Sequence, residues 1–409
     1  MLKRMLKRYF LNYKKRNFST ASIWIKGGSD MDSVSKKGIN KILSSLLTRE
    51  CEGFDNLSLA EYVESYGAEL NQEVYEDGIS IGIKSLNEHF SKLLPLLDLI
   101  INKPILSETE FQKVKKTSMD FIKKEKENPF NICFEKWRKI VYSDHPYAFN
   151  PIGNKNDVLK ITHEDILCEF KNFKIREKFI ISNNSKINGK DLSTLEEEIL
   201  KDDSRPKYYD IDPMNRFHYI NDNSNQTIIM IGNQTCSRRS SEYLPLKVLE
   251  SYLSYGMSAV LFKIFREKNG ITYDLGVFYP IRNENAPFLV YLSVSNNNAL
   301  LAFELLSSLW KDFLYKPLIH SEMFLAKEKL KASFLLGNQS LDEILQRKIQ
   351  LISYGISPTK ENDLNSKIDE ISSLDILKLT NKYFSKPYLS ISGNEEICSE
   401  INAIWNKNF

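Results

Sequence analysis

The chain has 409 residues, 42% of them hydrophobic and 27% charged, and its formal net charge is +3. This length suits roughly two to four domains with buried cores, and the near-neutral charge gives no indication of a nucleic-acid partner. The longest apolar run, around residues 93–106, is interrupted by Pro95, Asp98, Lys103 and Pro104, so we expect no segment that spans a membrane.

The cysteines and the first residues bear on the compartment. Five cysteines are scattered without a Cys-x-x-Cys pair, which favours a reducing compartment with buried thiols. Residues 1–29 contain no acid and are rich in lysine and arginine, which resembles a mitochondrial transit peptide. Residues 21–25 nevertheless look like a buried strand, which leaves at most a short removable tail. We therefore expect a cytoplasmic protein, with the mitochondrial matrix as the alternative.

Residues 38–47 are the stretch around which we interpret the first half. Their apolar residues recur at helical spacing and predict a helix with one face on a core. Positions 41 and 45 share the opposite face, with position 44 beside them. This layout suits a zinc helix, in which two histidines bind the metal and a neighbouring glutamate activates water. Lysine and serine stand there instead; protonated lysine cannot ligate, and serine is a poor zinc ligand.

The elements that follow are predicted from caps and periodicity. A capping box at 58–61 opens a helix that ends at Gly67, and alternation around Asp77-Gly78 predicts a hairpin over 69–85. Apolar residues predict a helix through 93–101. A second capping box at 107–110 begins a charged helix to about residue 127, where Asn128-Pro129 breaks it. Further helices are expected at about 130–142 and from Thr162 to about 173, with a strand at 178–182.

The second half of the chain repeats the pattern of the first. Residues 161–167 recur as 371–377, the strand at 179–182 recurs as 389–392, and the strand at 22–25 recurs as 227–231, followed again by an amphipathic helix at 244–253. A helix is expected near 192–200, and the proline-containing, charged run 202–213 is the best linker candidate. We predict domains at 1–200 and 217–409, joined by a linker at 201–216. The expected fold class is α+β, with two homologous halves, each a mostly antiparallel sheet covered by helices on one face.

Several motifs carry a resemblance to a known family. Residues 256–258 (Gly-Met-Ser), 261–262 (Leu-Phe) and 266–273 (Arg-Glu-Lys-Asn-Gly-Ile-Thr-Tyr) are similar to a long signature of the pitrilysin/insulinase zinc peptidases. Gly-Ala-Glu-Leu-Asn at 67–71 stands where relatives carry Gly-Gly-x-x-Asn before the edge strand that pairs with substrate. His145-Pro146, 151–153 and Ile161-Thr162 match a run in the family's first domain. The chain therefore resembles the short, two-domain, processing-peptidase-like form of this family over nearly its whole length.

The resemblance implies that the zinc site is degenerate. Active relatives carry Gly-x-x-His-x-x-Glu-His on the first helix, and alignment on Gly38 places Lys41 and Ser45 at the two histidines and Ser44 at the catalytic glutamate. The third ligand, a glutamate on the helix before the Asn-Pro break, falls on Phe121. None of the five histidines lies at ligand spacing from another. We expect no zinc in this chain and no catalysis by it alone.

The second half keeps the part of the site that needs no metal. By resemblance, Arg266 and Tyr273 hold the substrate backbone, and Asn71 stands beside the substrate-pairing strand. A guanidinium and a phenol can donate to peptide carbonyls and stabilise a developing oxyanion. Taken singly, Arg266 would be a solvated helix charge and Tyr273 a half-buried strand aromatic. The surrounding signature favours the substrate-binding role.

Some members of the family are heterodimers, in which one subunit has the zinc helix and the other has the Arg/Tyr pair. This chain resembles the second kind. The resemblance implies a non-catalytic subunit that pairs with a zinc-bearing sister and supplies Arg266 and Tyr273 to the partner's active site. Substrates in such enzymes add a strand to a sheet edge, which selects unfolded peptides. Zinc is expected in the partner only.

Three alternatives remain. A purely structural subunit, like the core proteins of a respiratory bc-type complex, would also lack the zinc helix, but a scaffold has no reason to keep the Arg/Tyr pair. The second alternative is the presequence-processing alpha subunit of mitochondria. That subunit has a long glycine-rich loop before Met-Ser, where this chain has only Tyr255-Gly256, and the difference counts against this alternative. A self-sufficient peptidase ranks last.

Overall fold

The strand predicted near residues 21–25 extends over Phe18–Lys26 (β2) in the computed structural model. The structure describes residues 6–12, 17–192, 216–222, 224–337, 340–361 and 363–409. They form two compact units between which the chain passes more than once. The first unit comprises Met1–Lys124, Phe149–Asp203 and Gly337–Glu361, and the second comprises Glu125–Ala148, Ser204–Leu336 and Asn362–Phe409.

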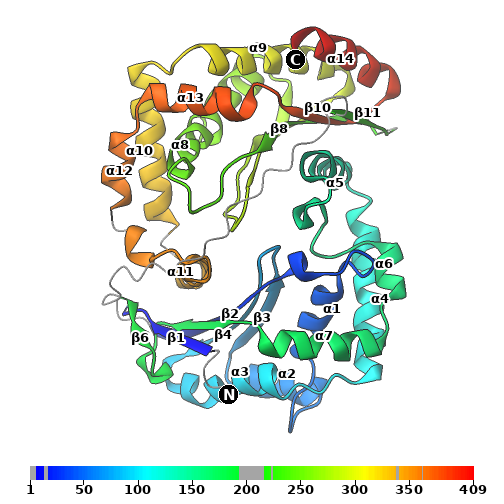
Figure 1. Cartoon of the computed structure of the whole chain (residues 1–409), viewed down its shortest axis with the longest axis vertical. Coiled ribbons are helices and arrows are strands. Elements are labelled where there is room, and N and C mark those ends of the chain that lie inside the picture. Colours follow the sequence, from blue (N-terminus) through cyan, green and yellow to red (C-terminus); the bar gives the residue numbers. More distant parts are fainter. Residues whose placement is uncertain (1–5, 13–16, 193–215, 223, 338–339, 362) are drawn as a thin grey trace. The chain divides into compact units, whose positions relative to one another are not determined.

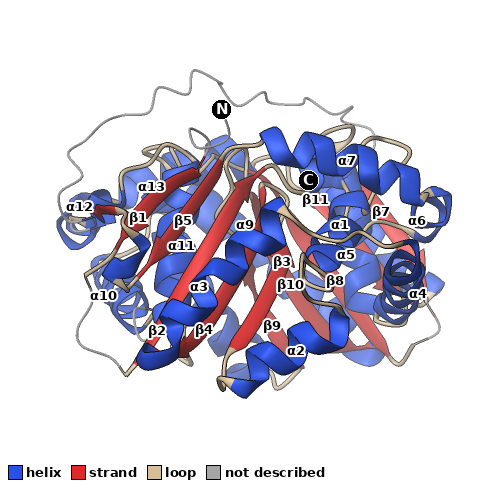
Figure 2. Cartoon of the chain, turned by 90° about the horizontal axis from the view of Figure 1, so that it is seen from below, coloured by secondary structure: helices blue, strands red, loops and turns tan. Residues whose placement is uncertain are grey.

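The first unit is built on a six-stranded sheet in the order β3-β4-β2-β5-β1-β6. Figure 2 labels all of these strands except β6. Neighbouring strands are antiparallel from β3 to β5, whereas β1 runs parallel to both β5 and β6. The predicted hairpin around Asp77-Gly78 is confirmed, because β3 and β4 pair on either side of it. Besides β2, the strands are β1 Leu6–Phe10, β3 Glu69–Val74, β4 Gly78–Leu86, β5 Lys178–Ser182 and β6 Lys190–Asp191.

Helices cover both faces of this sheet (Figure 1). Odd-numbered side chains of β2, such as Ile23 and Ile25, face a core shared with α1 and α3. Trp24 points to the other face, where it packs with α11 residues such as Leu345 and Ile349, because successive side chains of a strand alternate. The helices of this unit are α1 Ile39–Leu47, α2 Asn56–Ser65, α3 Asn87–Asn102, α4 Glu108–Glu125, α6 Lys155–Lys160, α7 His163–Ile175 and α11 Leu341–Ser353.

The second unit has a five-stranded sheet in the order β7-β11-β8-β10-β9. On one face, α5 packs against β8 and β11: Trp137 donates to the Tyr388 carbonyl (3.2 Å) and the Cys133 thiol contacts Ser390. The strands are β7 Phe217–Asn221, β8 Gln226–Gln234, β9 Thr272–Phe278, β10 Pro287–Ser295 and β11 Tyr388–Gly393. The helices are α5 Pro129–Tyr142, α8 Tyr243–Ser254, a π-helix at Phe262–Lys268, α9 Ala299–Tyr315, α10 His320–Leu336, α12 Leu364–Glu370, α13 Ser373–Phe384 and α14 Glu395–Asn408.

The two sheets share one connectivity, which confirms the predicted α+β class with two homologous, mostly antiparallel sheets. The expected cover on one face differs from the structure, because helices lie on both faces. The order β3-β4-β2-β5-β1 corresponds strand for strand to β9-β10-β8-β11-β7, with the last pair parallel in each unit. The predicted equivalence of residues 161–167 and 371–377 also holds, because Thr162 and Ser372 both close capping boxes. Each sheet gains cover on its second face from a helix of the other sequence half, namely α11 and α5.

Some local predictions were wrong, and others concern residues that the structure does not describe. The N-cap of α2 is Asp55 rather than Ser58, because Asp55 accepts from the Ser58 N–H (2.8 Å). The helix therefore starts three residues earlier than predicted. Strands β1 and β7 were not predicted, and β1 lies inside the segment that resembles a transit peptide. The helix expected at 192–200 and the linker at 201–216 lie almost wholly outside the described residues, so the predicted domain boundaries stay a prediction. None of the described helices is long and apolar enough to cross a bilayer.

Candidate functional site

The helix that resembles the zinc helix, α1, is held at its N-terminus by Asp32. The carboxylate accepts from the backbone N–H groups of Gly38 (2.7 Å) and Asn40 (3.2 Å) and from the Asn40 amide (2.7 Å). These bonds satisfy donors that a helix start leaves free. Gly38 has φ +97°, and a Cβ there would lie 2.7 Å from the Ile152 carbonyl oxygen. Only glycine therefore fits this close approach.

A buried arginine joins the same region to the end of α7. Arg176 donates to the Gly27 carbonyl and to the Asn40 side chain, both at 3.0 Å, and pairs with Glu169. Burial raises the pKa of Asp32 to about 6, although the three donated hydrogen bonds oppose the shift. The result is a fixed, mostly buried polar frame behind the first turn of α1.

The face of α1 that would hold metal is occupied by other bonds. Ser44 donates to Gln72 Oε1 (2.7 Å), and Gln72 Nε2 donates to Ser45 Oγ (3.3 Å). Gln72, on β3, thus bridges the positions of the catalytic glutamate and of one ligand. Burial lowers the pKa of Lys41, and Glu73 partly opposes the shift. No sequence signal distinguished Gln72, because its role comes from the packing of β3 against α1.

These residues do not fit zinc. Lys41 is a half-buried cation, the two serine hydroxyls are bonded to Gln72, and Phe121 on α4 is an apolar side chain that is 48% exposed. Zinc in proteins takes thiolate, imidazole or carboxylate ligands. Throughout the described part of the chain, no three His, Cys, Asp or Glu side chains gather in a group that could hold a metal.

Asn71 lies on β3, which is the outer strand of the first sheet. Its side chain is exposed and bends over Gly82 of β4, where a Cβ would meet Asn71 Oδ1 at 2.5 Å. The pairing of Asn71 with a glycine therefore leaves room for this conformation. An outer strand presents backbone groups that can pair with a further strand.

The second unit presents Arg266 on a π-helix at Phe262–Lys268. π-helical turns are rare and occur frequently at functional sites. Arg266 is exposed, and its guanidinium lies 5.0 Å from the Phe262 ring centre. Tyr273 follows on β9, the outer strand of the second sheet. The chain turns between them at Gly270 (φ +62°), where the Ile271 N–H donates to the Phe265 carbonyl (2.9 Å).

A buried ion pair supports the elements on both sides of this motif. Lys247 Nζ lies 2.7 Å from Glu250 Oε2 and donates to the Tyr279 carbonyl at the end of β9 (2.9 Å). Burial alone would lower the pKa of Lys247, but Tyr243, Glu250 and Tyr255 hold it above its usual value. Removing one partner of such a pair is costly because the other charge stays buried. The pair fixes α8 to the strand that carries Tyr273.

Two models of one protein family match the chain. Residues 9–154 match the model described as insulinase (peptidase family M16), and residues 176–330 match the peptidase M16 inactive domain. The chain belongs to peptidase family M16. The resemblance drawn from the motifs is thereby confirmed.

Similar proteins extend over most of this M16 chain. An uncharacterized zinc protease of Rickettsia felis is 23% identical over 88% of each chain. The non-peptidase homolog YmxG of Helicobacter pylori is 19% identical over 86% of this chain and 83% of its own. Among solved structures, a peptidase M16 inactive domain from Pseudomonas fluorescens has a TM-score of 0.80 at 19% identity, covering 94% of this chain and 95% of its own. At that identity the likeness shows a common fold.

Proposed function

We propose that this M16 chain is a non-catalytic subunit of a heterodimeric zinc peptidase, and that it helps bind peptide for a partner that carries the zinc. The observation that carries the proposal is the face of α1, where Gln72 bridges Ser44 and Ser45. The helix keeps its place in the fold, but its polar atoms are used for packing rather than for metal binding. The name of the Helicobacter pylori relative, a non-peptidase homolog, supports this proposal.

In the proposed enzyme, Arg266 and Tyr273 contact the substrate backbone. The exposed guanidinium of Arg266 can donate one or two converging hydrogen bonds to a peptide carbonyl oxygen or a developing oxyanion. A phenol at position 273 would supply a further donor. Asn71, on the outer strand β3, would contact a peptide that adds to this sheet edge. A yeast mitochondrial-processing peptidase subunit beta, itself a subunit by name, matches 36% of this chain at 22% identity.

The test is peptidase activity on a quenched, unstructured peptide, with zinc content measured on the same samples. The chain is assayed alone and mixed with an M16 chain from the same organism that has an intact His-x-x-Glu-His helix. We expect activity only in the mixture, and a loss of roughly tenfold or more for Arg266→Ala and Tyr273→Phe, since each removes a donor to the transition state.

Matched variants separate this role from a general effect of charge or ring chemistry. Lys263→Ala removes an exposed cation of the same π-helix that lies outside the Arg-Glu-Lys motif, and Tyr219→Phe removes an exposed phenol elsewhere in the same unit. Both are expected to keep full activity. Zinc and activity in the isolated chain would refute the proposal.

A purely structural subunit, which would act as a scaffold without binding substrate, is the second candidate function. It is favoured if the two chains form a stable complex whose activity is unchanged by Arg266→Ala and Tyr273→Phe. A complex that has no peptidase activity beyond that of the zinc-bearing chain would favour it as well.

A further inference from the structure

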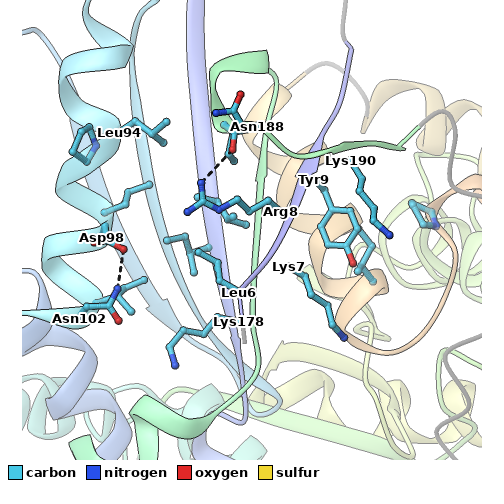
Figure 3. Close-up of a pocket in the computed structure, with 18 of the residues that line it drawn as sticks. Leu6, Lys7, Arg8, Tyr9, Leu94, Asp98, Asn102, Lys178, Asn188 and Lys190 are labelled. Carbon is cyan, nitrogen blue, oxygen red and sulfur yellow. Dashed lines mark hydrogen bonds between the residues drawn. The ribbon is translucent and has the colours of Figure 1, made fainter. Parts of the chain in front are cut away.

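The first unit contains a cavity of about 1310 Å³ at the side of the sheet where β1 lies (Figure 3). Most of its lining comes from β1, from β5 and the turn after it, from α3, and from the end of α11 and the segment that follows; β2, α7 and β6 add one residue each. Ligand pockets usually measure roughly 300–1,000 Å³, so the space is ample for a small molecule. None of its lining residues belongs to the α1 site or to the Arg266 motif.

The part of the cavity between α3 and β1 is an apolar slot. Strand alternation places Leu6 and Arg8 on the face of β1 that looks toward α3, and Lys7 and Tyr9 on the other (Figure 3). Register pairs Arg8 with Ile180 of β5, so Ile180 shares that face. The apolar walls of the slot are formed by Leu6, Leu94, Leu97, Ile101, Ile180 and Ile187.

The proline inside α3 also borders the slot. Pro95 has no N–H, so the Ser91 carbonyl lacks its usual helical donor. The hydroxyl of the same serine accepts a hydrogen bond from Lys186 (2.5 Å), which comes from the turn after β5. This bond joins the helix and the sheet beside the slot.

Positive charge dominates the lining. The lining holds five cations, Lys7, Arg8, Lys174, Lys178 and Lys190, and one carboxylate, Asp98. Lys7 is paired with Glu177 (3.0 Å) just outside the lining, so two carboxylates offset the five cations and the local surplus is +3. Asp98 already accepts from the Asn102 amide (2.8 Å). Lys178 is buried and donates to three carbonyls, so it contributes charge rather than a free donor. Such a surplus attracts an anion.

Arg8 is the cation best placed to meet a ligand in the slot. It is exposed, and its guanidinium donates a long hydrogen bond to the Ile187 carbonyl (3.4 Å). A planar guanidinium with unused donors recognises a carboxylate through two parallel hydrogen bonds. The apolar side chains next to it offer burial to a hydrocarbon chain rather than to a polar group.

We propose that this slot binds a single-chain amphipathic carboxylate, a fatty acid, with its hydrocarbon chain between α3 and β1 and its carboxylate at Arg8. Each buried methylene favours binding, and the cationic lining selects the sign of the head group. The site lies within the first unit and is independent of the proposed peptidase role.

The first test keeps the hydrocarbon chain constant and changes the head group. Laurate and dodecyltrimethylammonium are titrated calorimetrically into the full-length protein below their micellar concentrations, and dodecanol is titrated below its solubility limit. We expect saturable binding of laurate, roughly tenfold or more weaker binding of dodecanol because it lacks the charged pair, and no saturable binding of the cation. Equal affinity for the three head groups overturns the proposal, and this test needs no variant.

The second test uses variants whose folding is checked by thermal melting. Arg8→Leu is expected to weaken laurate binding roughly tenfold, whereas Arg8→Lys keeps the charge and loses less. Leu94→Trp fills the slot from a half-buried position of α3 and should abolish binding. Lys155→Leu, which removes an exposed cation of the same unit away from the slot, should bind as the wild type does. Unchanged binding by folded Arg8→Leu, or binding only to phosphatidylglycerol vesicles and not to free laurate, refutes the proposed site.

Discussion

Asp30 lies in the loop before α1, where its carboxylate accepts from the Gly28 N–H (2.7 Å). Burial, and secondarily the charge of Asp77, raises its pKa to about 7. The folded protein therefore holds a proton between about pH 4 and 7 that the unfolded chain releases. Stability contributed by this group falls as the pH rises through that window.

We expect Asp30→Asn to remove this part of the pH dependence. The amide oxygen can still accept from Gly28, and no charge has to be buried above pH 7. The variant should gain on the order of 2 kcal/mol in unfolding free energy at pH 8 relative to the wild type, and little at pH 4. Urea unfolding at the two pH values measures it.

The opposite pH dependence of the unfolding free energy is expected for Asp165→Asn. Burial would raise the pKa of Asp165, but its hydrogen bonds with Lys36 and Thr162 hold it below the usual value, so its stabilisation is present above the unfolded pKa and lost in acid. If the wild type and Asp30→Asn showed the same dependence of unfolding free energy on pH, the pH dependence could not be assigned to Asp30. Asp32 makes a poorer comparison, because both of its carboxylate oxygens accept bonds.

Gln72 gives a second prediction at the scale of one residue. Gln72→Leu keeps the approximate side-chain volume but leaves the hydroxyls of Ser44 and Ser45 without this partner. Unsatisfied buried polar groups cost roughly 1–3 kcal/mol, so we expect a loss of about 1–2 kcal/mol in unfolding free energy. Gln112→Leu, on the exposed face of α4, is the control and should change stability little. A loss equal in both variants would mean that the bridge contributes nothing.

The start of α1 provides a prediction at the scale of an element. Gly38 and Gly67 both have positive φ, but a Cβ at Gly38 would lie 2.7 Å from the Ile152 carbonyl oxygen, while Gly67 has nothing within 4 Å. Gly67→Ala should therefore cost only the backbone strain, about 1 kcal/mol. Gly38→Ala should cost roughly 3 kcal/mol or more, because the helix start must also move away from the loop. Denaturant midpoints of the two variants measure the difference, and similar values would show that the contact is relaxed cheaply.

Elements were predictable where the signal is local. The face of α1, the Asp77-Gly78 hairpin and the Thr162 and Ser372 caps depend on residues within a few positions of one another. Strand β1 was missed because Leu-Lys-Arg-Tyr-Phe is short and two of its five residues are charged. It is a strand because β5 and β6 flank it, and neither partner is visible in the local sequence.

The residues of the candidate sites were likewise predictable only where the signal is local. The positions of Lys41, Ser44 and Ser45 followed from helical periodicity and the family motif, whereas Gln72 and Arg8 gave no sequence signal. The role of Gln72 arises from the packing of β3 against α1, and the position of Arg8 from the pairing of β1 with β5, in both cases between elements that are distant in the chain. The exchange of α5 and α11 between the two sequence halves is a further long-range feature, which the internal repeat did not indicate.

This exchange predicts that the sequence halves do not fold independently. Residues 1–200 lack α11, whose Leu341, Leu345, Ile349 and Ile352 are buried on the face of Trp24 and Phe179. Burying four such side chains contributes roughly 6–12 kcal/mol, an upper estimate because unfolded chains are partly compact. Domains are stable by only about 5–15 kcal/mol. The same fragment would expose the buried Cys133 and Trp137 of α5, which pack in the second unit.

The experiment is expression of residues 1–200 and 217–409 separately and together. Each fragment alone should aggregate or melt without a cooperative transition, and the pair should copurify because each supplies the helix that the other sheet lacks. A version of the first fragment that carries residues 340–361 on a flexible linker is the control and should recover part of the cooperativity. If 1–200 melts cooperatively by itself, near the temperature of the whole chain, then α11 contributes little to the first sheet and its burial there is not what holds the unit together.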